Sequence, residues 1–160
     1  MKTREWILSL LSDRIWSARR EYVKVWEIAQ AAARAAEDKK GYEIVILHIS
    51  PISLIADYFV IASARNRAQM EAIADNVVEQ LDKCQQPLLH REGRGTGSWI
   101  LLDYGAVVVH IFREEARRFY ALESLWGDAP VYRLENLTTA ANLAIMPEVT
   151  TEQSGDDKEQ

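Results

Sequence analysis

The spacing of the apolar residues changes at Gly41, and this change constrains the fold more than any other feature of the sequence. Before Gly41 the apolar residues recur every three or four positions without glycine or proline, which predicts one long amphipathic helix or two shorter ones. Residues 44–49 are then almost continuously apolar, as in a strand covered on both faces, and Pro51 ends the run. A helix that leads into buried strands indicates an α/β domain.

Turn residues divide the rest of the chain into further strands and helices. Strands are predicted over residues 44–49, 58–63, 88–91, 99–103 and 106–112. One helix is predicted to begin after Asn66, a candidate N-cap with Gln69 three positions later. Another is predicted to begin at Glu114 and to end at Gly127. Its apolar face would consist of Phe119, Leu122, Leu125 and Trp126. We therefore predict a mixed five-stranded sheet with flanking helices, preceded by a helical extension.

Length and composition limit the class of protein. A chain of 160 residues is long enough for one core and too short for two, so we expect a single domain. No run of about eighteen apolar residues is present, so no membrane span is expected. The N-terminus has no secretory signal, and Cys84 is the only cysteine, which predicts a cytoplasmic protein without an intramolecular disulfide. After Pro130 we expect a weak helix up to Met146, and the polar, acidic residues 147–160 should be disordered.

The charge is unevenly distributed along the chain. Residues 1–40 carry nine Lys and Arg against six Asp and Glu, residues 41–130 carry eight against twelve, and residues 131–160 carry two against six. These sums of +3, −4 and −4 give the net charge of −5. Because nucleic-acid binding depends on clustered cations, the negative central segment predicts little direct nucleic-acid contact and a basic protein as partner.

Two apparent sites have simpler explanations. The glycines of residues 93–98 could suggest a phosphate-binding loop, but they open onto a predicted strand and not onto a helix N-terminus, so a flexible hairpin loop is the better interpretation. His48, His90 and His110 lack metal-ligand spacing. Two of them lie inside apolar strands, where we expect hydrogen-bonded core histidines, with a cross-strand site of His48 and His110 as the open alternative. Cys84 falls on the apolar face of the predicted helix, which predicts an inert buried thiol.

An acid and an aromatic residue meet at the end of two predicted strands. These pairs are Asp57 with Tyr58, and Asp103 with Tyr104, which Gly105 follows. They could form a recognition edge, although a turn-forming aspartate explains either position equally well. Strand alternation places Trp99, Leu101 and Asp103 on one face of the sheet. If that face is uncovered, an apolar patch with an acidic border results, and such patches mark partner sites.

Four segments resemble the ribosomal silencing factor family, which is also called the Iojap-like family. They are residues 36–41, 55–63, 99–110 and 119–130, in the family's order. The resemblance runs from about residue 25 to residue 130, and it divides the chain into an N-terminal extension (residues 1–24), the Iojap-like domain (residues 25–130) and a C-terminal extension (residues 131–160).

The resemblance implies a function and a set of contacts. Members of the family bind the large ribosomal subunit through ribosomal protein fourteen and sterically block its association with the small subunit, so that the protein would be a translational repressor, without a cofactor, and not an enzyme. The contact residues implied by family position are Trp99, Leu101, Asp103, Tyr104 and Gly105, with Asp57 and Tyr58 as weaker candidates. Trp99 would be the anchor, and Asp103 would meet a cation of the partner.

The resemblance also raises two rival functions. The family fold is similar to that of nucleotidyltransferases, so a nucleotide-binding protein is the alternative. Those enzymes hold metal ions with two carboxylates one residue apart on a strand, and Asp57 has no second acid two positions on. A self-associating protein, a homodimer when free, is the third hypothesis, because an uncovered apolar face can pair with its own copy.

Overall fold

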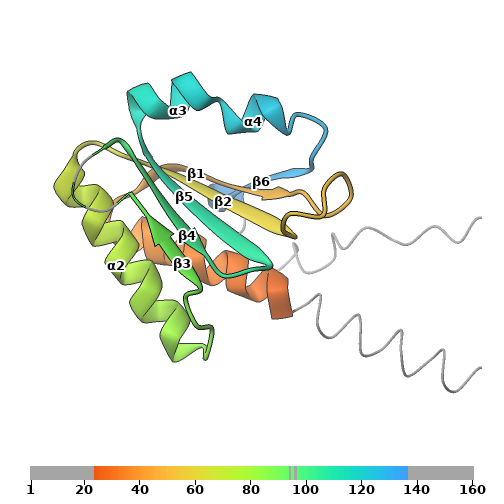
Figure 1. Ribbon diagram of the computed structural model, residues 1–160, viewed down its shortest axis with the longest axis horizontal. Helices are drawn as coiled ribbons and strands as arrows, with labels where there is room; N and C mark the ends of the chain where they lie inside the picture. The colour runs from red at the N-terminus through yellow and green to blue at the C-terminus, as the bar shows by residue number, and fades with distance from the viewer. Residues whose placement is uncertain (1–23, 94, 96, 137–160) are drawn as a thin grey trace, which may run out of the picture.

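A computed structural model describes residues 24–93, 95 and 97–136 (Figure 1). Residues 24–38 are helical, and we call them the N-terminal helix. The elements that follow are β1 (Tyr42–His48), β2 (Tyr58–Ala64), α2 (Arg67–Lys83), β3 (His90–Glu92), β4 (Trp99–Asp103), β5 (Val107–Arg113), α3 (Glu114–Tyr120), α4 (Leu122–Leu125), β6 (Val131–Arg133) and the 3-10 helix η1 (Leu134–Asn136). The weak helix predicted between Pro130 and Met146 is wrong in its described part, because residues 131–136 form the strand β6 and the 3-10 helix η1. The rest of that segment, the predicted helical extension before residue 24 and the predicted disordered segment from 147 lie outside the described residues.

The strands form one mixed sheet in the order β3-β4-β5-β2-β1-β6. Strands β2 and β5 are parallel, and the other neighbouring pairs are antiparallel. The mixed α/β sheet is confirmed, but it has six strands and not the predicted five. The missing strand is β6, whose three residues pair with Val45, Ile46 and Leu47 of β1. An edge strand of three residues shows too little alternation to be recognised in the sequence. Through β6 and the following η1, residues 131–136 are part of the folded domain.

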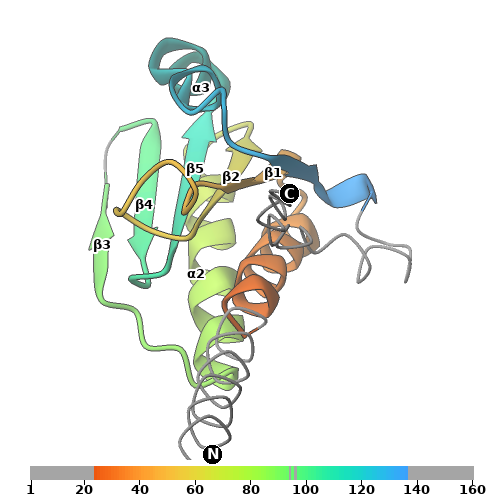
Figure 2. The ribbon, with the colours of Figure 1, turned by 90° about the vertical axis from the view of Figure 1, so that its right-hand side faces the viewer.

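The first face of the sheet is covered by the N-terminal helix and α2, which Figure 2 shows side by side below the strands. Small side chains let the N-terminal helix approach closely, since Ala29, Ala32 and Ala33 are completely buried. The two helices are also joined by a hydrogen bond, in which the buried Asn76 Nδ2 donates to the carbonyl oxygen of Ala35 at 2.8 Å. This face is therefore closed by the chain itself.

The N-cap of α2 is confirmed, and it allows a first prediction. The Asn66 side chain accepts a hydrogen bond from the Gln69 amide at 2.9 Å. Replacing Asn66 with alanine should lower the free energy of unfolding by about 1 kcal/mol, because the amide loses its acceptor. Urea denaturation measures this loss. Asn66→Gly is the matched control, since glycine is itself a good N-cap and should cost only a few tenths of a kcal/mol. Equal losses in the two variants would contradict the capping role.

The second face is covered by α3 and α4, which lie above the sheet in Figure 1. The prediction of one helix from Glu114 to Gly127 is wrong, because the chain breaks at Ala121, which has left-handed dihedral angles (φ 44°, ψ 51°). Two members of the predicted apolar face are consequently exposed, Phe119 to 81% and Leu125 to 71%. The Arg117 guanidinium stabilises the chain on both sides of this break, because it donates hydrogen bonds to Ser63 on β2 and to Glu123 on α4.

Candidate partner-binding surface

The second face is open along β4. Trp99, Leu101 and Asp103 are partly exposed there, while Ile100 and Leu102 point into the core on the first face. The alternation predicted for this strand is therefore confirmed. On the neighbouring β5 the residues of the same face are buried, so the helical cover ends between β5 and β4. We call Trp99, Leu101 and Asp103 the open strip; it spans about 13 Å at about 3.3 Å per residue.

Trp99 forms the aromatic end of the open strip and is held by the chain itself. Its indole Nε1 donates to His110 Nδ1 at 3.2 Å. Its ring centroid lies 4.9 Å from that of Phe112 and 4.6 Å from that of Tyr120. Trp99 is therefore presented in a fixed orientation and retains only part of its surface for a partner.

His110 supports Trp99 from inside the fold. Burial lowers the pKa of His110 to about 4, so the imidazole is neutral at pH 7 and its Nδ1 can accept the indole proton. The other ring nitrogen, Nε2, is buried and has no hydrogen-bond partner among the described residues. The ring also packs edge-on against Phe59, with centroids 4.7 Å apart.

Asp103 and Asp57 form the acidic end. The Asp103 Oδ1 accepts a hydrogen bond from the Gly105 amide at 2.7 Å, and Gly105 has the positive φ of 81° that this turn requires. The turn-forming interpretation of Asp103 is thus confirmed. Asp57 reaches the same end of the sheet because its amide donates to the carbonyl oxygen of Ala106 at 2.8 Å. Both carboxylates remain partly exposed.

Tyr58 and Tyr104 do not lie on the open strip. Both belong to the core of the first face, where Tyr58 is 2% and Tyr104 9% exposed. The Tyr58 ring packs against His48, with centroids 4.8 Å apart, and burial raises the pKa of Tyr104 to about 12. The prediction that the two tyrosines contact a partner is therefore corrected: both are core residues. The reason is the strand alternation, which places a residue that follows a surface aspartate on the opposite face.

Two groups of surface residues beside the open strip were missed in the sequence. On β3, His90 pairs with Asp103 and Glu92 with Leu101, so that an acid also borders the middle of the strip. In the loop between β1 and β2, three aliphatic side chains are exposed: Ile52 to 45%, Leu54 to 104% and Ile55 to 67%. Apolar residues directly after Pro51, in a segment predicted as a loop, were the available signal for the second group.

The histidine and cysteine predictions have mixed outcomes. His48 and His110 are buried, as predicted. The alternative prediction, a site shared by His48 and His110, is wrong, because the two rings lie on opposite faces of the sheet. His48 stacks on Tyr58 of the first face, and His110 packs against Phe59 of the second. Among the described residues, no group of three or more His, Cys, Asp or Glu could hold a metal ion. Cys84 is exposed and not buried, because α2 ends at this residue and its side chain leaves the apolar face.

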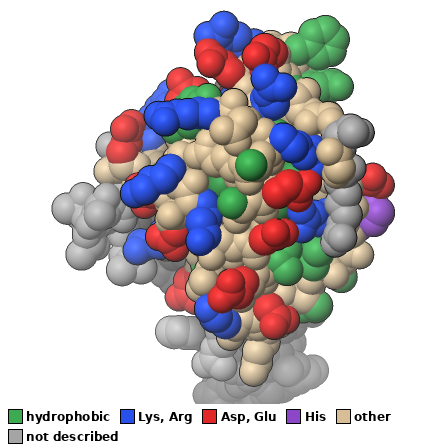
Figure 3. Space-filling model, turned by 90° about the vertical axis from the view of Figure 1, so that its left-hand side faces the viewer, with side chains coloured by type: hydrophobic (Ala, Val, Ile, Leu, Met, Phe, Trp, Pro, Cys, Tyr) green, Lys and Arg blue, Asp and Glu red, His purple; other side chains and the backbone are tan. Residues whose placement is uncertain are grey.

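The glycine-rich segment is the loop of the β3–β4 hairpin, as predicted. It lies against the first turn of α2, where Arg67 Nη1 donates to the carbonyl oxygen of Gly97 at 3.0 Å. The Glu71 carboxylate accepts from the Gly95 amide and pairs with Arg67 and Arg91, and these contacts lower its pKa although its desolvation opposes the shift. Figure 3 shows acidic and basic side chains interspersed over this side of the molecule. The Gly95 amide is therefore bound to a carboxylate and is not free to bind a phosphate.

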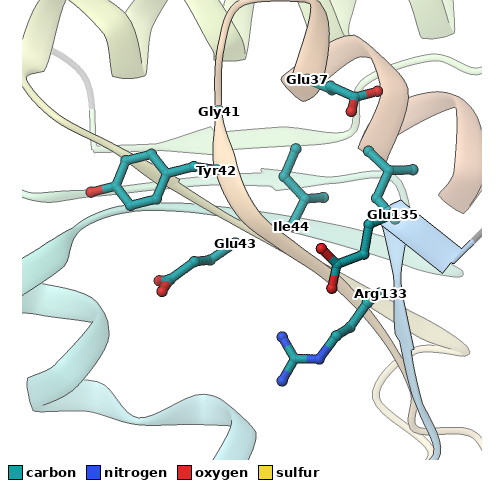
Figure 4. Close-up of a pocket in the computed structure, with 8 residues that line it drawn as sticks. Glu37, Gly41, Tyr42, Glu43, Ile44, Arg133 and Glu135 are labelled. Atoms are coloured by element: carbon teal, nitrogen blue, oxygen red, sulfur yellow. The ribbon is translucent and has the colours of Figure 1, made fainter.

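A shallow pocket of about 350 Å³ lies between the end of the N-terminal helix, β1 and β6 (Figure 4). The pocket is lined by three carboxylates, those of Glu37, Glu43 and Glu135, and by one cation, Arg133. An excess of carboxylates repels a nucleotide's phosphates. This pocket therefore gives no support to the nucleotide-binding alternative.

In the described part of the chain, no helix is long and apolar enough to cross a membrane.

Comparisons with known proteins give a consistent result. The profile of the family described as "Ribosomal silencing factor during starvation" (RsfS) matches residues 23–159. The ribosomal silencing factor RsfS of Halalkalibacterium halodurans is 40% identical over 111 residues, which cover 69% of this chain and 95% of that protein. RsfS of Bacillus subtilis is 41% identical over 108 residues, 68% of this chain and 92% of that protein. A crystal structure of a protein from Chromobacterium violaceum is similar with a TM-score of 0.63 and 33% identity, covering 64% of this chain and 86% of that one.

Proposed function

Since the chain belongs to the ribosomal silencing factor family, we propose that it binds the large ribosomal subunit through ribosomal protein fourteen and sterically blocks association with the small subunit. The observation that carries the proposal is the open strip on β4, where the sheet is left uncovered on a face that α3 and α4 otherwise close. A partly apolar sheet surface with an acidic border is suited to burial against a basic protein.

The action we propose is obstruction and not chemistry. A bound protein of this size occupies a subunit face without changing a covalent bond, so it needs only affinity and position. Leu101 supplies apolar area at the centre of the open strip, and Glu92 and Asp103 supply negative charge at its border. Such charges raise the rate of encounter with a cationic partner and fix its orientation.

The experiment that tests the function uses the full chain and purified ribosomal subunits. The chain should co-sediment with large subunits at near-physiological salt and lower the yield of joined ribosomes in proportion to the amount bound. Absence of binding to isolated large subunits would refute the proposal. Binding that leaves subunit joining unchanged would refute the steric mechanism.

A single-atom change isolates the role of charge at the acidic end. Asp103→Asn should keep the hydrogen bond with the Gly105 amide, because the asparagine side-chain oxygen can still accept it, but it removes the negative charge. We expect the dissociation constant for large subunits to rise about tenfold, which corresponds to about 1.4 kcal/mol. Glu79→Gln is the control, since Glu79 lies on α2, which covers the opposite face of the sheet. An unchanged dissociation constant for Asp103→Asn would exclude Asp103 as a charge contact.

A further inference from the structure

The loop that joins β1 and β2 exposes three aliphatic side chains within four positions, Ile52, Leu54 and Ile55. Leu54 is as accessible as it would be in an extended peptide, with 104% of its reference surface exposed. Large aliphatic side chains that cluster on a surface usually mark a place where another molecule binds.

The loop has its own internal hydrogen bonds. The amides of Ile52 and Ser53 donate to the carbonyl oxygen of Ile49 at 3.0 and 2.9 Å, and the amide of Ile55 donates to the Ser53 hydroxyl at 3.2 Å. The backbone of the loop is therefore ordered before any partner arrives. A preformed loop loses little conformational freedom on binding, which favours affinity.

The base of the loop lies at the acidic end of the open strip. The amide of Ile49 donates to the carbonyl oxygen of Asp57 at 2.9 Å, and Asp57 in turn contacts Ala106 in the β4–β5 turn. Figures 1 and 2 show the loop projecting from the same end of the sheet as that turn. Asp57 and Asp103 thus lie at the end of the sheet from which the loop projects.

We propose that Ile52, Leu54 and Ile55 form an aliphatic prong that enters an apolar pocket with a cationic rim on the same ribosomal protein that the open strip contacts. This inference rests on the proposed function and adds a second contact to it. Asp57 and Asp103 at the base of the prong meet the cations of the rim.

The charges at the base favour a basic protein over two other occupants. An anionic membrane would be repelled by Asp57 and Asp103, and the loop itself contains no Lys or Arg to attract it. A second copy of the chain that docks prong to prong would bring the same acidic base against itself. A basic protein matches both the apolar tip and the acidic base.

The test compares two exposed leucines in the full chain. Leu54→Ser should raise the dissociation constant for purified large subunits at least tenfold, while Leu125→Ser on α4 should change it less than twofold. Because both side chains are exposed, both variants should keep the wild-type unfolding transition. If wild type binds and Leu54→Ser binds equally well, the prong inference is overturned while the proposed function stands. If wild type itself does not bind, the proposed function fails and the prong inference fails with it.

A cross-linking experiment identifies what the prong touches. A photo-reactive side chain introduced as Leu54→p-benzoylphenylalanine should cross-link to a protein of the large subunit, and a cross-link to ribosomal RNA alone would overturn the inference.

Two further measurements test the other occupants. Light scattering of free wild type and Leu54→Ser tests whether the prong binds a second copy of the chain. Loss of a dimer in the variant, with subunit binding retained, would assign the prong to self-association. Flotation with neutral and anionic vesicles tests the membrane, and Leu54-dependent flotation with unchanged subunit binding also overturns the inference.

Discussion

Lowering the pH from 7 to 5 should reduce the free energy of unfolding by about 2 kcal/mol through His110 alone. In the native state burial lowers the pKa of His110 from 6.5 to about 4, so the unfolded chain takes up a proton that the native chain does not. The stability contributed by neutral His110 is therefore complete above pH 6.5, and it is lost as the pH falls from 6.5 towards 4. The total loss approaches about 3 kcal/mol at the end of that range.

The measurement is urea denaturation of wild type and His110→Gln at pH 7 and pH 5. Glutamine retains an acceptor for the Trp99 indole but does not titrate, so the pH-dependent loss should be smaller by about 2 kcal/mol in the variant. Burial also lowers the pKa of His48, although Asp57 opposes the shift, so His48 contributes a pH-dependent loss that remains in the variant. The carboxyl group of Glu71, with its lowered pKa, loses its contribution only below pH 4.5. The same pH-dependent loss in both proteins would contradict a buried neutral His110.

The same titration reaches the surface. A protonated His110 has no lone pair on Nδ1, so it cannot accept the Trp99 indole proton. Acidification should therefore loosen the aromatic end of the open strip before the chain unfolds. Because the native pKa of His110 is about 4, binding to large subunits should weaken through this coupling only as the pH falls from 5 towards 4, and more in wild type than in His110→Gln.

Sequence patterns predicted those features whose cause is local. The faces of β4 follow from alternation along five residues, and the start of α2 follows from one side chain, Asn66, that caps it. Such features need no knowledge of distant contacts. Burial of Tyr58 and Tyr104 could have been predicted in the same way, by extending the alternation one residue past each aspartate.

Features that depend on distant contacts could not be predicted. Alanine favours helix, so nothing in the local sequence marks Ala121 as the break between α3 and α4, which is held by the Arg117 contact with Ser63 on β2. The strand β6 exists because β1 offers it an edge to pair with. Leu54 is exposed in a loop whose base is fixed by Asp57 and Ala106, two residues that only the fold brings together.

The largest loss of stability is expected for Gly93→Ala. Gly93 has a φ of 85°, and a Cβ atom added there would lie 2.1 Å from the Trp99 carbonyl oxygen, far inside contact distance. That oxygen belongs to the backbone of β4 and cannot turn aside, so the β3–β4 hairpin must open and carry Trp99 with it. We expect the free energy of unfolding to fall by at least about 3 kcal/mol and binding to large subunits to be lost.

Gly95→Ala separates this collision from the strain of a positive φ. Gly95 has a φ of 82°, close to that of Gly93, but an added Cβ would meet no atom of the described residues within 4 Å, apart from its chain neighbours. Both alanines pay the same conformational penalty of about 1 kcal/mol, so the difference between the variants measures the contact with Trp99 alone. Gly95→Ala should therefore remain folded at 25 °C and bind large subunits like wild type. If urea denaturation gives the two variants equal stability, Gly93 does not lie against the Trp99 carbonyl oxygen. The hairpin would then hold Trp99 in a different orientation on the open strip.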